Sequence, residues 1–205
     1  MVDIGAIILA AGRSTRFAGG SGTTKLAAIL RGKLLVRHVA EAALQSSARP
    51  VIVVTGHRSA EVEAALRGLE LSFAANLAYS AGLAASLQRG ISALPPTCAG
   101  AVILLGDMPL VTGALIDRLI GAFREKLAAW PEAPLAAAPV RAGARGNPAL
   151  IGRGLFAEIA KLNGDRGASA LIDLAGGRLV ECLVDDDAAL IDVDTREALR
   201  SLESD

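Results

Sequence analysis

The stretch Ile4-Gly5-Ala6-Ile7-Ile8-Leu9-Ala10, followed by Ala11 and Gly12, decides the fold that we expect for this chain. A continuous apolar run of this length is typical of a strand that is buried on both faces, as in parallel sheets covered by helices. The small residues after it leave room for backbone N–H groups to approach an anionic ligand. The stretch therefore predicts a parallel sheet with a binding site at the carboxyl end of its first strand.

Strands and helices are expected to alternate along the rest of the chain. Apolar runs predict strands at residues 51–55, 69–75, 101–105, 135–140, 149–151, 178–183 and 190–193. Helical spacing and capping residues such as Ser59 predict helices at residues 34–44, 60–67, 81–93, 113–129, 154–161, 168–174 and from 195. This order predicts a three-layer α/β fold with a mostly parallel sheet. Since no repeat or linker interrupts it, we expect residues 1–205 to form a single domain.

The composition excludes several kinds of partner. The 205 residues carry 21 basic and 21 acidic side chains, so no net field attracts nucleic acid or a membrane surface. The apolar runs are shorter than the roughly 18 residues that suggest a membrane span, and the first residues do not resemble a signal peptide. Cys98 and Cys182 match neither a metal-ligand spacing nor a disulfide framework. We therefore expect a cytoplasmic protein without nucleic-acid or membrane partners.

A loop with three basic residues follows the first strand. Arg13, Arg16 and Lys25 could clamp the oxygens of a triphosphate, because arginine offers a bidentate fork and lysine a point charge. Gly12 does not belong to a G-x-G-x-x-G dinucleotide fingerprint, and Lys25 is not preceded by glycine as in a Walker A loop. A phosphate-binding loop of another kind and an ordinary surface turn both fit this pattern.

A carboxylate, Asp107, follows the apolar run of residues 101–105. A charge at the end of a buried strand needs compensation, and Mg²⁺, which binds carboxylates together with phosphate oxygens, would supply it. A role as a turn cap is the alternative. Asp192 and Asp194 end another apolar run. Because alternate residues of a strand point to opposite faces, we expect only one of them to reach the metal, Asp192 before Asp194, which can instead cap the last helix.

Four segments of the chain match the motifs of one family. They are Leu9-Ala10-Ala11-Gly12-x-Ser14-x-Arg16 with a later lysine, Gly106-Asp107-Met108-Pro109-Leu110, the set Asn76, Tyr79, Gly82, Ser86 and Leu87, and Arg145-Gly146-Asn147-Pro148-Ala149-Leu150 with Phe156 and Gly164-Asp165-Arg166-Gly167-Ala168 after it. In order and spacing these segments resemble the molybdenum-cofactor nucleotidyltransferases, and among them the molybdenum cofactor cytidylyltransferase branch. The resemblance extends over nearly the whole chain.

The resemblance implies a glycosyltransferase-A-like, Rossmann-like nucleotidyltransferase fold and an Mg²⁺-dependent enzyme. The implied reaction moves a nucleotide, CMP from CTP, onto the phosphate of molybdopterin and releases pyrophosphate, and the product would be handed to a molybdoenzyme or its chaperone. With the assignments made above, the expected catalytic residues are Lys25, Asp107 and Arg16, and the expected metal ligands are Asp107, Asp192 and Asp194. The expected nucleotide-binding residues are Leu9, Ala10, Ala11, Gly12, Arg13, Ser14, Lys25 and Gly106. The expected substrate-binding residues are Asn76, Gly82, Ser86, Arg145 and Asn147.

Two other functions stay open at this stage. An NTP transferase acting on a sugar or alditol phosphate would share the loop and Asp107, and a non-catalytic maturation factor would hold the cofactor without turnover. Ala11 stands where guanylyl members of the family usually carry glycine. Its methyl group is worth about 1–3 kcal/mol of discrimination, which favours CTP without excluding GTP or ATP.

Overall fold

The computed structural model describes residues 2–14, 17, 24–129 and 136–204. In this part of the chain eight strands form the main sheet, in the order β10-β7-β9-β6-β1-β4-β5 with β8 paired to β7, and β2 and β3 form a separate hairpin. The strands are β1 (Asp3–Ala10), β2 (Ile29–Leu30), β3 (Lys33–Leu34), β4 (Val51–Thr55), β5 (Ser72–Ala75), β6 (Cys98–Leu105), β7 (Ala136–Arg141), β8 (Ala144–Arg145), β9 (Ala149–Gly152) and β10 (Leu179–Leu183).

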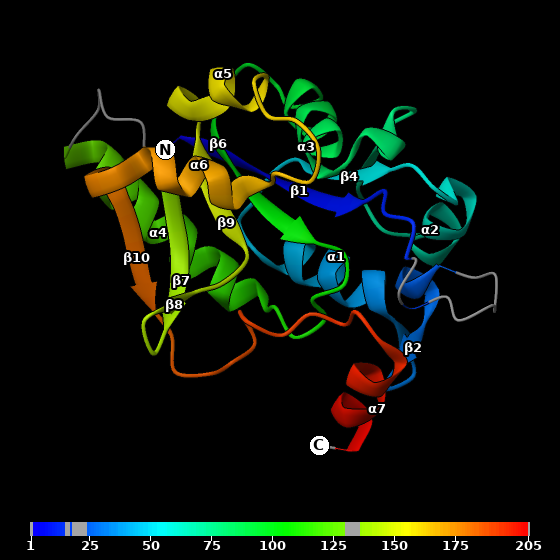
Figure 1. Ribbon diagram of the computed structural model, residues 1–205. Helices are drawn as coiled ribbons and strands as arrows, with labels where there is room; N and C mark the ends of the chain where they lie inside the picture. The colour runs from blue at the N-terminus through cyan, green and yellow to red at the C-terminus, as the bar shows by residue number, and fades with distance from the viewer. Residues whose placement is uncertain (1, 15–16, 18–23, 130–135, 205) are drawn as a thin grey trace.

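Helices cover both faces of this sheet (Figure 1). The α-helices are α1 (Leu35–Gln45), α2 (Ser59–Ala65), α3 (Leu83–Ser92), α4 (Gly113–Ala129), α5 (Phe156–Ile159), α6 (Ala168–Ala175) and α7 (Arg196–Ser204), and the 3₁₀ turns are η1 (Lys25–Ala27), η2 (Tyr79–Ala81), η3 (Arg153–Leu155) and η4 (Gly176–Arg178). β1 pairs in parallel with β4 and β6, β4 with β5, and β10 with β7, while β8 and β9 run antiparallel to their neighbours. The predicted three-layer, mostly parallel α/β fold is confirmed.

The apolar run of β1 is explained by two cores, one on each face of the sheet. Ile4, Ala6 and Ile8 pack in the core that α1, α2 and α4 cover, whereas Ile7 and Leu9 pack in the core under α3, α5 and α6. On the second face Gly90 of α3 allows a close approach, since a Cβ there would lie 2.5 Å from Ile7 Cγ2. A strand buried on both sides has no polar face, as its sequence predicts.

The pairing of β1 with β6 brings two distant loops to one edge of the sheet. Leu9 is in register with Leu105, and the Gly106 N–H donates a 3.1 Å hydrogen bond to the Leu9 carbonyl just beyond the strand. The loop that begins at Ala11 and the loop that carries Asp107 therefore leave the sheet side by side. This edge is where ligands bind in parallel α/β sheets.

Two local expectations fail for physical reasons, and one hairpin was not predicted. Residues 190–193 are not a strand; their apolar character serves a third small core in which Val193 packs with Leu30 and Leu202. α2 begins at Ser59, so Arg58, with a left-handed φ of 57°, occupies the capping position predicted for Ser59. The hairpin of β2 and β3 is too short to produce an alternating pattern.

None of the helices in the described ranges is long and apolar enough to span a membrane.

Thr55, at the end of β4, is fully buried, and its hydroxyl finds no hydrogen-bond partner among the residues that the structure describes. An unsatisfied buried hydroxyl costs stability that an apolar group of the same shape does not. We expect Thr55→Val to leave the free energy of unfolding unchanged or to raise it by about 1 kcal/mol, measured by urea unfolding. Thr24→Val is the matched control.

Thr24 is equally buried, but its hydroxyl accepts a hydrogen bond from the Leu26 N–H. The control should therefore lose about 1 kcal/mol. A loss in Thr55→Val as large as that in the control would mean that the Thr55 hydroxyl does contribute to stability.

Candidate active site

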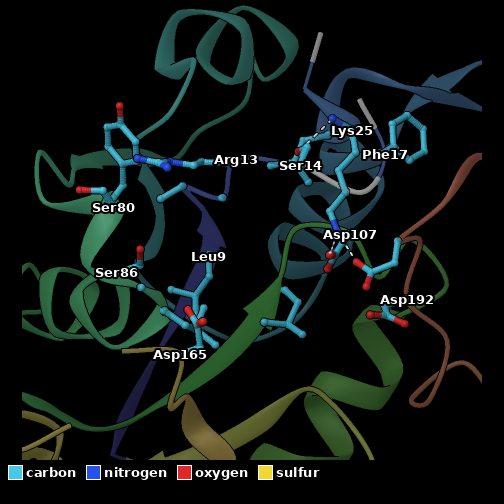
Figure 2. Close-up of a pocket in the computed structure, with 18 residues that line it drawn as sticks. Leu9, Arg13, Ser14, Phe17, Lys25, Ser80, Ser86, Asp107, Asp165 and Asp192 are labelled. Atoms are coloured by element: carbon cyan, nitrogen blue, oxygen red, sulfur yellow. Dashed lines mark hydrogen bonds and ion pairs between the residues drawn. The ribbon is translucent and has the colours of Figure 1, made fainter. Parts of the chain in front are cut away.

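A cleft of about 520 Å³ opens at the carboxyl ends of β1 and β6. The loop after β1, the turn η1 and the acidic segments after β6 and before α7 form part of its walls (Figure 2). The turn η2, the start of α3 and the loop before α6 form the rest. The residues that line it are Leu9, Ala11, Gly12, Arg13, Ser14, Phe17, Lys25, Leu26, Tyr79, Ser80, Gly82, Leu83, Ser86, Leu105, Asp107, Asp165, Asp192 and Asp194.

Two hydroxyl side chains fasten the loop after β1 to Lys25. Ser14 has a φ of 54°, and its Oγ accepts a hydrogen bond from the Lys25 backbone N–H at 3.1 Å. The same Oγ lies 3.2 Å from Thr24 Oγ1, which in turn accepts the Leu26 N–H and caps η1. These contacts fix the point from which the Lys25 side chain enters the cleft.

Lys25 points into a cluster of acids (Figure 2). Its Nζ lies 2.5 Å from Asp107 Oδ2 and 2.6 Å from Asp194 Oδ1. Asp107, Asp192 and Asp194 each offer a carboxylate oxygen, and these oxygens all lie within 4.8 Å of one another. The ammonium group thus offsets part of the charge of three carboxylates.

The pKa of Lys25 reflects two opposing influences. Burial is the largest single one and lowers the pKa, but attraction and hydrogen bonds from Asp107 and Asp194 together outweigh it and raise the pKa above its usual value of 10.5. Lys25 is therefore charged at neutral pH. Its interaction with the acids stabilises the fold fully below the unfolded-state pKa, and this contribution is lost only as the pH rises through the raised value.

A backbone contact brings the three acids together although they are far apart in sequence. Asp107 follows β6, and its carbonyl accepts a hydrogen bond from the Val193 N–H at 2.9 Å. Asp192 and Asp194 flank Val193, so this one bond places both of them beside the end of β6.

The expectation that only one of Asp192 and Asp194 reaches the site was wrong. Residues 190–193 do not form a strand, so no period of two separates the neighbouring side chains, and both line the cleft. The capping role considered for Asp194 falls to Thr195, whose Oγ1 accepts a hydrogen bond from the Ala198 N–H at 3.1 Å.

The wall opposite the acids is built around the start of α3. Gly82 has a φ of 102°, and a Cβ on it would lie 2.4 Å from the carbonyl of Gly164, so only glycine allows this contact. The contact sets Asp165 in the cleft beside Gly82, since the same Cβ would lie 2.9 Å from Asp165 Oδ1. Asn76 is buried behind this wall and donates a 3.0 Å hydrogen bond to Ser86 Oγ. It supports Ser86 and does not line the cleft itself.

Arg13 lies at the rim of the cleft against an aromatic ring. Its guanidinium carbon is 5.8 Å from the centroid of the Tyr79 ring, and the His57 ring lies 5.7 Å from the same ring. A cation over an aromatic face gains a modest attraction. The contact keeps the positive charge of Arg13 next to the loop after β1.

Most of the residues predicted from sequence meet in this cleft. Those that line it are Leu9, Ala11, Gly12, Arg13, Ser14, Lys25, Gly82, Ser86, Asp107, Asp192 and Asp194. Ala10 and Gly106 are neighbours of lining residues and belong to the supporting backbone. Arg145 and Asn147 do not line the cleft, and Arg16 lies outside the described residues.

Sequence reasoning did not assign a site role to seven lining residues. They are Phe17, Leu26, Tyr79, Ser80, Leu83, Leu105 and Asp165. For Asp165 a signal was available, because a charged pair between Gly164 and Gly167 suggests a loop that packs closely against something. Its partner, the start of α3, became apparent only in the fold.

The acid cluster fits a hard divalent cation. Carboxylate oxygens are the ligands that Mg²⁺ and related cations take, commonly with substrate phosphate oxygens completing the shell. Two of the three acids, Asp107 and Asp194, already hold one cationic group, the Lys25 ammonium, at 2.5 and 2.6 Å. The donor set and its present neutralisation both favour a cation at this position.

Comparison with known proteins identifies a family and a similar protein for this chain. The MobA-like NTP transferase domain family matches residues 6–182. The bifunctional protein GlmU of Albidiferax ferrireducens is 36% identical over 122 residues, which are 57% of this chain and 26% of the relative. The chain thus spans about a quarter of the length of that relative.

Solved structures resemble the chain over its full length. Rv0371c from Mycobacterium tuberculosis H37Rv superposes with a TM-score of 0.82 at 28% identity, covering 100% of this chain and 99% of the other. A structure of Rv0371c in complex with manganese has a TM-score of 0.77 at 28% identity and covers 99% of each chain.

The position of Lys25 predicts competition with a divalent cation. Because its ammonium contacts two of the three acids, Lys25→Met should free their oxygens and remove a nearby positive charge. We expect the variant to bind Mn²⁺ at least about tenfold more tightly than the wild type, measured by electron paramagnetic resonance without nucleotide. Lys33→Met, which removes an ion pair with Glu41, should not change the affinity. Equal or weaker Mn²⁺ binding in Lys25→Met would contradict a cation site at these oxygens.

Proposed function

This chain belongs to the MobA-like NTP transferase domain family, and on that premise we propose that it transfers CMP from CTP to the phosphate of a molybdopterin-type acceptor and releases pyrophosphate. The observation that carries the nucleotidyl transfer is the meeting of Lys25 and three carboxylates with a small-residue loop in one cleft. We take residues 1–205 as one catalytic domain that works in the cytoplasm and delivers its product to a molybdoenzyme or its chaperone.

The loop after β1 is suited to phosphate groups. Ala11 and Gly12 add little bulk, and among the residues that the structure describes a Cβ on Gly12 would meet no atom within 4 Å. These residues therefore create no steric need for glycine at this position, whereas a ligand that approaches the backbone does. Arg13 and Lys25 bring positive charge to the same space.

Asp107, Asp192 and Asp194 would hold Mg²⁺ or Mn²⁺. When bound, the metal would neutralise phosphate charge and polarise phosphoryl oxygens. The manganese complex of Rv0371c supports a divalent cation in a protein of this fold and at this level of identity.

The residues of the chain act mainly by positioning and by charge. An acceptor phosphate is already an anion at neutral pH, so one of its oxygens can attack the α-phosphorus of the nucleotide without a general base. The bond from that phosphorus to the bridging oxygen breaks, and pyrophosphate leaves with the electron pair. Lys25, charged at neutral pH, would offset the charge that develops on the leaving group.

The choice of acceptor and base rests on the sequence resemblance. Ala11 favours CTP, and the motif around Asn76 and Ser86 favours the pterin, with Ser86 in the cleft and Asn76 hydrogen-bonded to it. A sugar or alditol phosphate is the second candidate. The wall opposite the acids carries the hydroxyl groups of Ser80 and Ser86 and the carboxylate of Asp165. These groups suit a polyhydroxylated substrate equally well.

The decisive experiment measures pyrophosphate release with CTP, GTP, ATP and UTP, each with molybdopterin, with sugar and alditol phosphates, or with no acceptor. We expect release with CTP and molybdopterin. Asp107→Ala should abolish it while the protein stays folded, and Lys25→Ala should lower turnover about 10²- to 10³-fold. Asp117→Ala, which alters an exposed carboxylate that accepts the Ser47 N–H, is the control for folding.

Each alternative outcome has a distinct meaning. Release with a sugar or alditol phosphate alone would replace the acceptor and keep the transferase. Tight molybdopterin binding with no release from any NTP would indicate a maturation factor. Turnover by Asp107→Ala at the wild-type rate would remove Asp107 from the reaction.

Gly12 offers a test of the nucleotide loop. Since a Cβ on Gly12 meets no atom of the described part of the chain, Gly12→Ala should leave the free energy of unfolding unchanged but raise the KM for CTP about tenfold or more. Gly106→Ala is the contrasting variant: its Cβ would lie 3.2 Å from the Leu9 carbonyl, so we expect it to lower stability instead. An unchanged KM in Gly12→Ala would show that no ligand approaches this part of the loop.

A further inference from the structure

The turn between β8 and β9 carries a sequence motif that the cleft does not use. Gly146 and Asn147 follow Arg145, yet none of the three lines the cleft. Arg145 is paired instead with Asp173 at 3.1 Å and, at 3.8 Å, with Glu181. Its charge is already engaged by acids that do not line the cleft.

The backbone of this turn packs directly on Ala189. The Asn147 N–H donates a 2.8 Å hydrogen bond to the Ala189 carbonyl. A Cβ on Gly146 would lie only 2.3 Å from that same carbonyl oxygen. The turn is itself anchored to β7, because the Gly146 N–H donates to the Pro139 carbonyl at 2.9 Å. Glycine is thus required here by a close backbone contact and not by a positive φ.

Ala189 belongs to the segment that delivers two of the three acids. This segment, residues 184–194, starts at β10, where the Val184 N–H donates to the Val140 carbonyl at 3.0 Å, and ends at the bond from Val193 to Asp107. Ala189 is buried in the middle of it, shortly before Asp192. In Figure 1 the segment runs below the sheet as an orange-red connection from β10 to α7.

We infer that Gly146 and the Asn147 N–H form a strut that sets Asp192 and Asp194 against Asp107. The inference rests on the proposed function, since it assigns these positions a role toward the cation that the three acids would hold. Gly146 is a positioning residue: it acts through Ala189 and touches neither substrate nor metal. This role accounts for a motif that the sequence alone assigned to the acceptor.

The geometry gives the expected consequence of filling the space at Gly146. A methyl group cannot remain 2.3 Å from a carbonyl oxygen, so the backbone on one side of the contact must shift. Because the Gly146 N–H is bonded to the Pro139 carbonyl, we expect Ala189 to move and the chain toward Asp192 to move with it. The carboxylate oxygens of the cluster lie within 4.8 Å of one another, a separation that a displacement of about 1 Å disturbs. Loss of the groups that orient metal ligands lowers metal affinity about 10- to 100-fold.

The first test compares Mn²⁺ binding by wild type and Gly146→Ala, measured by electron paramagnetic resonance, with the melting temperature recorded for both. We expect Gly146→Ala to bind Mn²⁺ about 10- to 100-fold more weakly. Gly177→Ala is the matched control, because a Cβ there meets no atom of the described residues within 4 Å and its φ is not positive. It should bind Mn²⁺ like the wild type.

The outcomes separate this inference from the proposed function. If the wild type itself binds no Mn²⁺, the cation site of the proposed function fails. If the wild type binds and Gly146→Ala binds equally well, the strut fails and the proposed function stands. Weakening in Gly177→Ala as large as in Gly146→Ala would also overturn the strut, since the effect would not depend on Ala189.

A second test needs no variant and decides the matter if Gly146→Ala does not fold. Coupling between two sites is reciprocal, so a strut that favours metal binding must itself be stabilised by metal. Hydrogen exchange of the wild type, followed by mass spectrometry on peptides covering residues 144–150, should slow at the Asn147 amide when Mn²⁺ is added. Unchanged exchange at that amide under saturating Mn²⁺ would overturn the strut.

Discussion

The site depends on the parallel pairing of β1 with β6. Their register places Leu9 opposite Leu105, and one further hydrogen bond, from Gly106 to the Leu9 carbonyl, holds the strand ends together beyond the ladder. Gly106 serves this meeting, since a Cβ on it would lie 3.2 Å from that carbonyl. The two cores on either side of the sheet fix the register, because a slip by one residue would exchange the side chains that face them. The loop after β1 and Asp107 are thereby brought together although they are far apart in sequence.

Charge at this edge is balanced within the protein. Three carboxylates within 4.8 Å of one another would repel, and the partly buried positions of Asp107 and Asp194 add a desolvation cost. Lys25 enters from a turn that Ser14 and Thr24 hold in place and contacts two of the acids. The pKa of Lys25 is raised because the attraction of these acids outweighs the cost of burying the ammonium group. The cleft thus has a charged cluster at the edge of a sheet whose two faces are packed in apolar cores.

The fold was largely predictable from sequence because its strands are buried on both faces and are punctuated by glycine and proline. The site was predictable where a residue immediately follows such a strand, as with Gly12 and Asp107. Prediction failed where tertiary contacts decide. Residues 190–193 are apolar because a third core buries Val193, so a strand was inferred wrongly and Asp192 and Asp194 were placed on opposite faces. Asp165 reaches the cleft through a contact between Gly82 and Gly164, and the pattern around Asp165 does not identify Gly82 as the partner.

The position of Lys25 in the acid cluster also affects the order in which a metal ion and a nucleotide bind at this edge. While its ammonium sits between Asp107 and Asp194, the oxygens that would hold a divalent ion are occupied by an internal counter-ion. A nucleotide carries several negative charges on its phosphates, and these would draw the ammonium toward themselves and uncover the oxygens. Metal and nucleotide then bind most readily as one chelate, so the protein alone binds a divalent ion more weakly than the protein together with its nucleotide.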